Sequence, residues 1–408
     1  MTGGSQFEAA ARRLPGVPKE TLFTARYFTM CGFTFTVFLS AFQLFPTAPY
    51  RILDLGGDKF AAGLFLGLQT WASAISAPFT GALGDRIGRR KMLVGCSLVA
   101  TVFSLLYALA PSWPVLVLLV FVYGIFWSGL LAASSAYMTA LIPAQRRAEG
   151  FGYWGMATML AVAVAPGLGL LLYKKGWIWV CASAAVLNLV MAGIALTLPE
   201  AHVPPAERPK RLRDFVEWKV LGMASSLFLT SFGYGAVVSF AALWTEQNGV
   251  APRGIWFTTF ALVVLVSRLF SGRLADRVGA RRLLLPAFVL GAVALLLLGS
   301  ATTRGALVGS AALYGLTFGN AYTFFVAYLL KHVPSERRGA AFGAIIAAFD
   351  TGIGTGSMAL GALAERVGFG SAFHVGGALA LLSPVAFLLA ERRFLREKTA
   401  ARPPGIGG

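Results

Sequence analysis

Residues Val115 to Tyr137 read VLVLLVFVYGIFWSGLLAASSAY, a run of 23 residues without a single charged side chain. A helix needs about 20 apolar residues to cross the ~30 Å hydrocarbon core of a bilayer, so this run is long enough for one span. Closed β-barrels are the other spanning architecture, but they read as short strands of alternating polarity. That alternation is absent here. The run therefore predicts an α-helical membrane protein.

The composition of the whole chain agrees with this class. Of its 408 residues 57% are hydrophobic and 13% are charged, about half of the ~25% usual in soluble domains. The net charge of +18 is spread over short clusters between apolar runs, which favours membrane topology over nucleic-acid binding. The polar first 25 residues precede a full-length span, an order that does not fit a cleaved signal peptide. No metal or disulfide spacing joins the three cysteines, Cys31, Cys96 and Cys181.

Similar runs predict about twelve spans, at 26–47, 59–82, 91–111, 114–136, 149–173, 176–198, 218–243, 254–275, 282–301, 305–330, 338–366 and 370–390. The longest polar connection separates the sixth span from the seventh. The expected domains are an N-terminal tail (1–25), a first six-helix bundle (26–198), a linker (199–217), a second six-helix bundle (218–390) and a C-terminal tail (391–408).

The distribution of Lys and Arg predicts the orientation of the spans. Both tails and the loops after even-numbered spans carry 27 of these residues, the opposite loops carry seven, and Arg268 lies within a span. Basic loops stay in the cytoplasm. Both termini and the linker are therefore expected on the cytoplasmic side of a bacterial-type inner membrane.

The two halves of the chain repeat at an offset of 191 residues. Ser76–Arg86 (SAPFTGALGDR) aligns with Ser267–Arg277 (SRLFSGRLADR), and Pro143–Gly152 (PAQRRAEGFG) aligns with Pro334–Gly343 (PSERRGAAFG). One offset that serves separated matches indicates two homologous units in the same orientation, as in transporters built from parallel repeats around a central pathway.

The loop GALGDRIGRR, from Gly81 to Arg90, resembles the signature between the second and third spans of the major facilitator superfamily, and GRLADRVGARR, from Gly272 to Arg282, resembles its second copy. The resemblance implies two six-helix bundles that rock around a site in the middle of the membrane. The closest motifs are those of the drug and metabolite efflux antiporter branch.

The two signature loops are candidates for a conformational latch. A short turn needs glycines for tight backbone bends, and a carboxylate can bind nearby arginines or a helix N-terminus when the cytoplasmic side closes. The alternative is that these charges only set topology, but the second copy favours the latch. The latch residues are Gly81, Asp85, Arg86, Gly88, Arg89, Arg90, Gly272, Asp276, Arg277, Gly279 and Arg281.

Asp350 is the only acid in the apolar run Ala340–Leu363. An ionisable group at such depth is a functional candidate, and burial disfavours its charged form, which suits a carboxyl that binds and releases a proton. Direct substrate contact and a structural role are the alternatives. Arg268 lies at a similar depth, and it is expected either to pair with Asp350 or to extend its guanidinium to the cytoplasmic interface.

Pro166, Gly167 and Gly169 in the fifth span resemble the Gly-Pro signature of antiporters in this family, with Ala165 where Gly is usual. They imply a kinked helix, and an ordinary small-residue packing seam is the alternative. A mostly apolar substrate cavity is expected from polar and aromatic groups inside spans: Gln43, Gln69, Tyr123, Trp127, Ser128, Tyr234, Asn320, Tyr322 and Thr323.

These patterns predict a monomeric secondary transporter that exports a small organic or amphipathic compound by alternating access, with H⁺ as the coupling ion. The fourth span lacks the Arg common in family exporters, so coupling would depend on Asp350. A symporter or facilitator for a metabolite and a non-transporting membrane sensor remain alternatives. No hydrolase or metalloprotease motif is present, so no enzyme activity, cofactor, ATP or nucleic acid is expected.

Overall fold

The structure is a computed structural model that describes residues 21–143, 146–200, 218–330, 332–333 and 338–400. In these ranges every regular element is a helix. The first half contains α2 (Ala25–Leu44), the short α3 (Ala48–Asp54), α4 (Lys59–Ile87), α5 (Arg89–Leu109), α6 (Trp113–Leu141), α7 (Arg147–Tyr173) and α8 (Trp177–Thr197). The second half contains α9 (Trp218–Gln247), α10 (Ile255–Val278), α11 (Ala280–Gly299), α12 (Arg304–Leu330), α13 (Arg338–Ala380) and α14 (Ser383–Ala400).

The long helices correspond to the twelve expected spans. In the described ranges, ten stretches are long and apolar enough to cross a membrane, and the last of them, Gly343–Phe394, has 52 residues. A helix of that length would extend about 78 Å at 1.5 Å per residue, far more than a bilayer is thick. The stretch is divided at Gly368, where φ is 86°, and so supplies the expected eleventh and twelfth spans. The remaining expected span is α12.

Local sequence explains where several helices begin and end. The Thr24 side chain accepts a hydrogen bond from Tyr27 N (3.2 Å), and Asp58 Oδ1 accepts one from Ala61 N (2.6 Å), so both residues act as N-caps. Gly88 and Gly279, which are repeat equivalents, have φ angles of 100° and 96°. These glycines reverse the chain between α4 and α5 and between α10 and α11, in a conformation that costs other residues about 1–2 kcal/mol.

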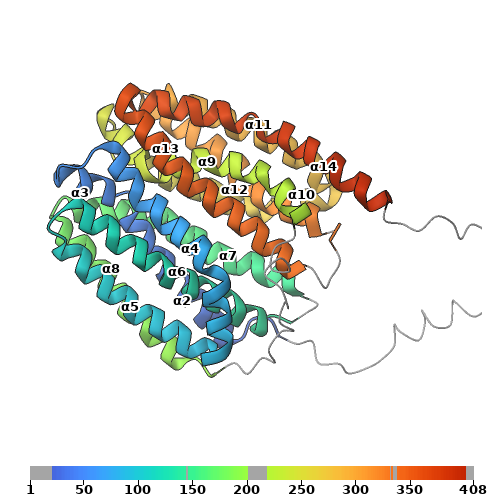
Figure 1. The fold of residues 1–408 in the computed structure, drawn as a ribbon, viewed down its shortest axis with the longest axis horizontal. Helices are drawn as coiled ribbons and strands as arrows, with labels where there is room; N and C mark the ends of the chain where they lie inside the picture. The colour runs from blue at the N-terminus through green and yellow to red at the C-terminus, as the bar shows by residue number, and fades with distance from the viewer. Residues whose placement is uncertain (1–20, 144–145, 201–217, 331, 334–337, 401–408) are drawn as a thin grey trace, which may run out of the picture.

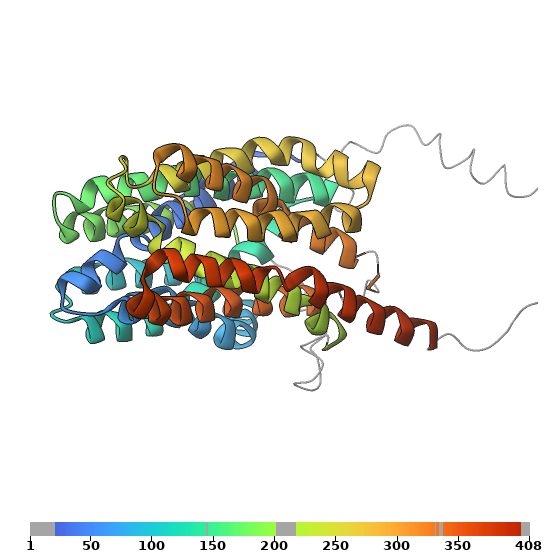
Figure 2. The same cartoon turned by 90° about the horizontal axis from the view of Figure 1, so that it is seen from above.

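The two halves lie side by side (Figure 1), with α2 to α8 in one bundle and α9 to α14 in the other. Figure 2, turned by 90°, shows the long helices of both bundles running roughly parallel to one long axis. We call the end at which α2, α5, α7, α9, α11 and α13 begin the linker end, and the opposite end the far end. Large apolar side chains such as Phe79 and Leu109 are exposed on the outside, as lipid-facing positions require.

Two helix seams join the bundles. The helix α4 packs on α13, and α7 packs on α10. The 191-residue repeat carries α4 onto α10 and α7 onto α13, so the repeat exchanges the two seams. In the first seam α4 approaches α13 so closely that a Cβ at Gly63 would overlap the Ser357 carbonyl. Small residues at such crossings allow close helix packing in membranes.

Candidate functional site

Asp350 lies in the middle of the first part of α13, and its residue is half-buried. Among the described residues it makes no hydrogen bond and no ion pair. In a low-dielectric environment a carboxylate without a partner is costly. The carboxyl group of Asp350 therefore has no polar partner in the described part of the chain.

Aromatic rings from three helices surround the approach to Asp350. The ring centroids of Tyr322 and Phe349 are 5.3 Å apart, and those of Phe318 and Phe349 are 5.9 Å apart. Phe318 also stacks on Tyr314 at 4.7 Å and lies 4.6 Å from Tyr234. Tyr322 lies within electrostatic range of Asp350. The stack provides flat apolar surfaces beside a single acid.

Arg268 on α10 is also half-buried, but it does not pair with Asp350. Its Nε is enclosed and has no hydrogen-bond partner. Its Nη1 lies against α7, 2.8 Å from where a Cβ on Gly155 would be. Of the two arrangements expected from the sequence, the pair between Arg268 and Asp350 is not formed among the described residues.

The residues expected to line a substrate cavity fall into separate places. Asn320 is buried, and its Nδ2 donates to Ser267 Oγ (2.8 Å) and to Leu316 O (2.9 Å), so this amide links α12 to α10. Gln69 and Tyr123 line a small pocket inside the first bundle. Trp127 packs on Phe38, Phe45 and Tyr123, Ser128 bonds to Thr80, and Gln43 is buried with both amide atoms unpaired. Only Tyr322 and Tyr234 belong to the aromatic stack near Asp350.

The antiporter-like residues lie at close helix contacts. The helix α7 continues through Pro166. A Cβ at Gly169 would overlap the backbone of Gln43 on α2, and Gly167 lies against Gly254 at the start of the second seam. These contacts agree with a small-residue packing seam.

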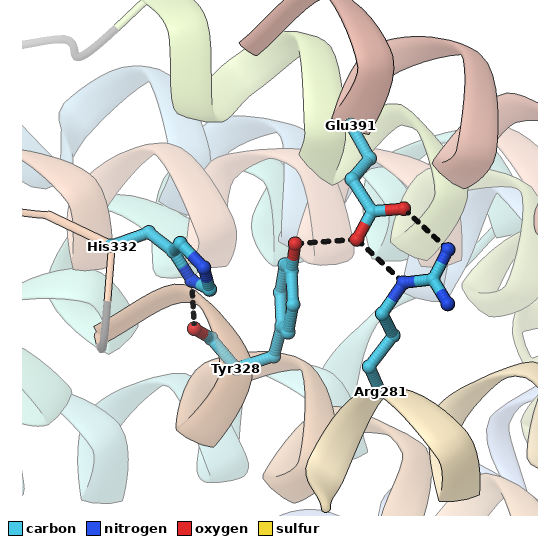
Figure 3. Close-up of polar contacts among 4 residues, drawn as sticks. All are labelled: Arg281, Tyr328, His332 and Glu391. Carbon is cyan, nitrogen blue, oxygen red and sulfur yellow. Dashed lines mark hydrogen bonds and ion pairs between the residues drawn. The ribbon is translucent and has the colours of Figure 1, made fainter. Parts of the chain in front are cut away.

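Some arginines of the two signature loops bind partners within their own bundle. Arg281 forms a bidentate ion pair with Glu391, with Nε to Oε1 at 2.7 Å and Nη2 to Oε2 at 2.8 Å, and the Tyr328 hydroxyl donates to the same carboxylate (Figure 3). His332 Nδ1 lies 2.8 Å from the Tyr328 carbonyl oxygen. This arrangement joins α11, α12 and α14 at the linker end.

The first bundle contains the counterpart at the repeat offset. The backbone N of Arg90 donates to Glu200 Oε1 (3.3 Å), its Nη2 donates to Leu196 O (2.6 Å), and the Tyr137 hydroxyl donates to Pro199 O (2.7 Å). Arg89 Nη1 donates to Ala136 O (2.7 Å), whereas Arg86 and Arg277 are exposed. The side chains of Asp85 and Asp276 lie outside the described part of the structure.

Sequence reasoning missed the acids of these two clusters. Glu200 and Glu391 are 191 residues apart, as are Tyr137 and Tyr328. The same offset that revealed the signature loops would have identified both pairs.

Polar contacts between the bundles occur in the far-end half of the described helices. Lys59 N donates to Glu365 Oε2 and Lys59 Nζ donates to Ala364 O, both at 3.0 Å. Closer to the middle, Ser357 Oγ donates to Gly63 O (2.8 Å). The remaining contacts are Trp71 to Thr355, Thr258 to Ala163 O, Lys59 over Phe369 and Arg253 over Tyr50. The structure therefore has its bundles joined at the far end.

Comparison with known proteins identifies the class that this fold and these motifs define, a membrane transporter built from two helical bundles. The family model "Major Facilitator Superfamily" matches residues 30–251 and 223–406, and the chain belongs to that family. An uncharacterized MFS-type transporter of Pseudomonas aeruginosa is 27% identical over 83% of this chain and 86% of its own length. The uncharacterized MFS-type transporter YhhS of Escherichia coli K12 is 26% identical over 82% and 85%.

Solved structures share the fold at lower identity. The nucleoside transporter NupG aligns with a TM-score of 0.69 and 15% identity over 90% of this chain and 100% of its own. The human organic anion transporter MFSD10 aligns with a TM-score of 0.66 and 18% identity over 91% and 100%. The chain is thus a multi-pass membrane transporter of the MFS type.

Proposed function

We propose that this protein is a secondary active transporter that works by alternating access and exports a small organic or amphipathic compound in exchange for protons. The observation that carries the proposal is Asp350, a carboxyl without a hydrogen bond or ion pair among the described residues, in the middle of a span and beside an aromatic stack. The active unit is a monomer in the inner membrane with both termini in the cytoplasm.

The cycle follows from the behaviour of a buried acid. When Asp350 is enclosed, desolvation favours the protonated form; when it faces water, it can release its proton. With the linker end in the cytoplasm, the present arrangement, closed at the far end, is the one from which a proton leaves inward and a solute enters. The reverse arrangement would release the solute outside and take up the next proton.

The signature loops would govern the other half of the cycle. In this structure Arg90 and Arg281 bind partners within their own bundles, and Arg89 donates one hydrogen bond to Ala136 O of its own bundle. We propose that closure of the linker end brings Asp85 and Asp276 against the opposite bundle. An Asp85→Asn variant would then favour the arrangement that is open to the cytoplasm, and distance spectroscopy across the linker end would measure the change in population.

The first test compares wild type with Asp350→Asn in a bacterium stripped of its own efflux pumps, with growth measured over a panel of toxic compounds and metabolites. The matched control is Asp58→Asn, which also removes one carboxylate but keeps a residue that caps α4 equally well. Membrane levels of all three proteins are measured by immunoblot.

Resistance with wild type and Asp58→Asn that disappears with Asp350→Asn would support proton-coupled export. Resistance that survives Asp350→Asn would remove the coupling role of this residue. If no compound in the panel separates wild type from the empty vector, export is overturned.

A further inference from the structure

The guanidinium of the half-buried Arg268 is a positive charge for which the described residues supply no anion. Its Nε is enclosed without a partner, and no ion pair joins Arg268 to a described carboxylate. An arginine cannot lose its proton in a protein. A charge within a span is costly unless it is paired or hydrated. Something other than these side chains must therefore compensate the charge.

Asp350 does not need Arg268 in return, because a carboxyl can neutralise itself by binding a proton. The two residues also lie in different seams, since α10 packs on α7 whereas α13 packs on α4 and α9. Of these two described residues, Arg268 is therefore the one whose charge is permanent.

The guanidinium lies at the seam between the bundles. Its Nη1 is close enough to Gly155 that any side chain there would displace it, the Cβ position being 2.8 Å away. This contact is nearer to the linker end than the far-end contacts at Gly63 and Lys59. A solute held here would therefore touch both bundles.

Aromatic side chains of α12 and α13 lie at the level of Arg268 along the helices. Ser267, the neighbour of Arg268, accepts a hydrogen bond from Asn320 Nδ2 at 2.8 Å. Asn320 lies on α12 between Phe318 and Tyr322, whose rings both contact Phe349. Flat apolar rings stack well on such a surface.

We propose that Arg268 binds the single anionic group of a monoanionic solute whose aromatic or otherwise apolar body lies against the half-buried Tyr322 and Phe349. The inference rests on the proposed transport function and names its substrate class. A carboxylate or sulfonate can accept two parallel hydrogen bonds from one guanidinium. Arg268 is the one arginine or lysine that the described residues place beside these rings, so a dianion would leave its second charge without a partner among them.

The test uses purified full-length protein in lipid nanodiscs and four probes with one ring system: 2-naphthoate, 2-naphthamide, 2-naphthylmethylammonium and naphthalene-2,6-dicarboxylate. Thermal unfolding is followed with each probe for wild type, Arg268→Gln, Arg268→Lys and Arg304→Gln. Arg304 is an exposed arginine at the far-end start of α12 and serves as the matched control.

The expected result is that 2-naphthoate raises the melting temperature of wild type and Arg304→Gln by about 2 °C or more at saturation, and that the other three probes do not. Its apparent affinity falls by on the order of tenfold or more in Arg268→Gln and by less in Arg268→Lys, which keeps the charge but not the fork of donors. Equal protection by the amide or the ammonium probe, or equal protection of Arg268→Gln, would overturn the proposal.

If Arg268→Gln does not fold, wild type and Arg268→Lys are compared instead, because both keep a cation at this position. Weaker binding of 2-naphthoate by Arg268→Lys than by wild type would then support the proposal, and equal binding would overturn it. The results also distinguish failure of this binding site from failure of the proposed transport function. Anion binding that depends on Arg268, combined with no export of any compound, would keep this site and remove the transport cycle. Export that depends on Asp350, combined with no preference for the anionic probe, would support the transport cycle and overturn the anion site at Arg268.

Discussion

Arg281, at the start of α11, and Glu391, in the third turn of α14, form a bidentate ion pair in which the two side chains are unequally exposed. The side chain of Glu391 is 5% exposed, whereas that of Arg281 is 47% exposed. The Tyr328 hydroxyl donates to the same carboxylate. The exposed guanidinium of Arg281 thus compensates the negative charge of the buried Glu391 carboxylate.

We expect Arg281→Gln to destabilise the protein by about 1–3 kcal/mol, because the buried Glu391 carboxylate loses its charged partner and cannot turn to water. Thermal unfolding in nanodiscs would measure the change. Arg282→Gln is the control, since Arg282 is an exposed neighbour on the same turn. An equal shift for both variants would mean that the ion pair contributes nothing beyond surface charge.

The fold could be predicted because it depends on patterns that the chain repeats. Uncharged runs such as Val115–Tyr137 predicted spans, and the 191-residue offset predicted two like bundles, as the structure has. The twelfth span was harder to delimit, since the helix of α14 continues through Ala400 where a polar tail was expected to begin at 391. Charged residues such as Glu391 end an apolar run without ending a helix.

Side-chain direction could not be read in the same way. The polarity of Asn320 made it a candidate for substrate contact, yet its amide bonds to Ser267 on a neighbouring helix. The sequence predicts that a polar residue in an apolar run has a hydrogen-bond partner, because buried polar groups are usually paired. It does not show whether that partner is a solute or another helix. Likewise Arg268 and Asp350 lie at similar depth, but depth does not reveal that α10 and α13 belong to different seams.

The close approach at Gly63 gives a test of the closed far end. Gly63→Val would place a side chain against the Ser357 carbonyl, and such overpacking costs about 1–3 kcal/mol. Because that cost applies only while α4 and α13 are in contact, the variant should favour opening at the far end. Spin labels at Lys175 and Thr302, both exposed at the far end, should report a longer distance. Gly95→Val is the control, since nothing lies near its Cβ position; a distance unchanged in both variants would contradict the expectation.

Lys59 provides a polar contact across the same seam. Lys59→Met removes the hydrogen bond from Nζ to Ala364 O and the cation–π contact with Phe369, while the backbone bond to Glu365 remains. The expected loss is about 0.5–1.5 kcal/mol of far-end closure. Hydrogen–deuterium exchange of residues 59–70 and 355–365 should accelerate, with Lys175→Met as the exposed control. Exchange as slow as in wild type would show that apolar packing alone holds the seam.

The orientation of the linker end can be measured directly. The basic residues are divided 27 to seven between the two sides, and a bias of this size retains the basic loops in the cytoplasm. In a background with Cys31, Cys96 and Cys181 replaced by Ala, a cysteine at Lys175 should react with an impermeant maleimide on intact bacterial cells. A cysteine at Ala140, exposed at the linker end, should react only after the cells are permeabilised. The opposite pattern would reverse the orientation, so that the closed far end would face the cytoplasm.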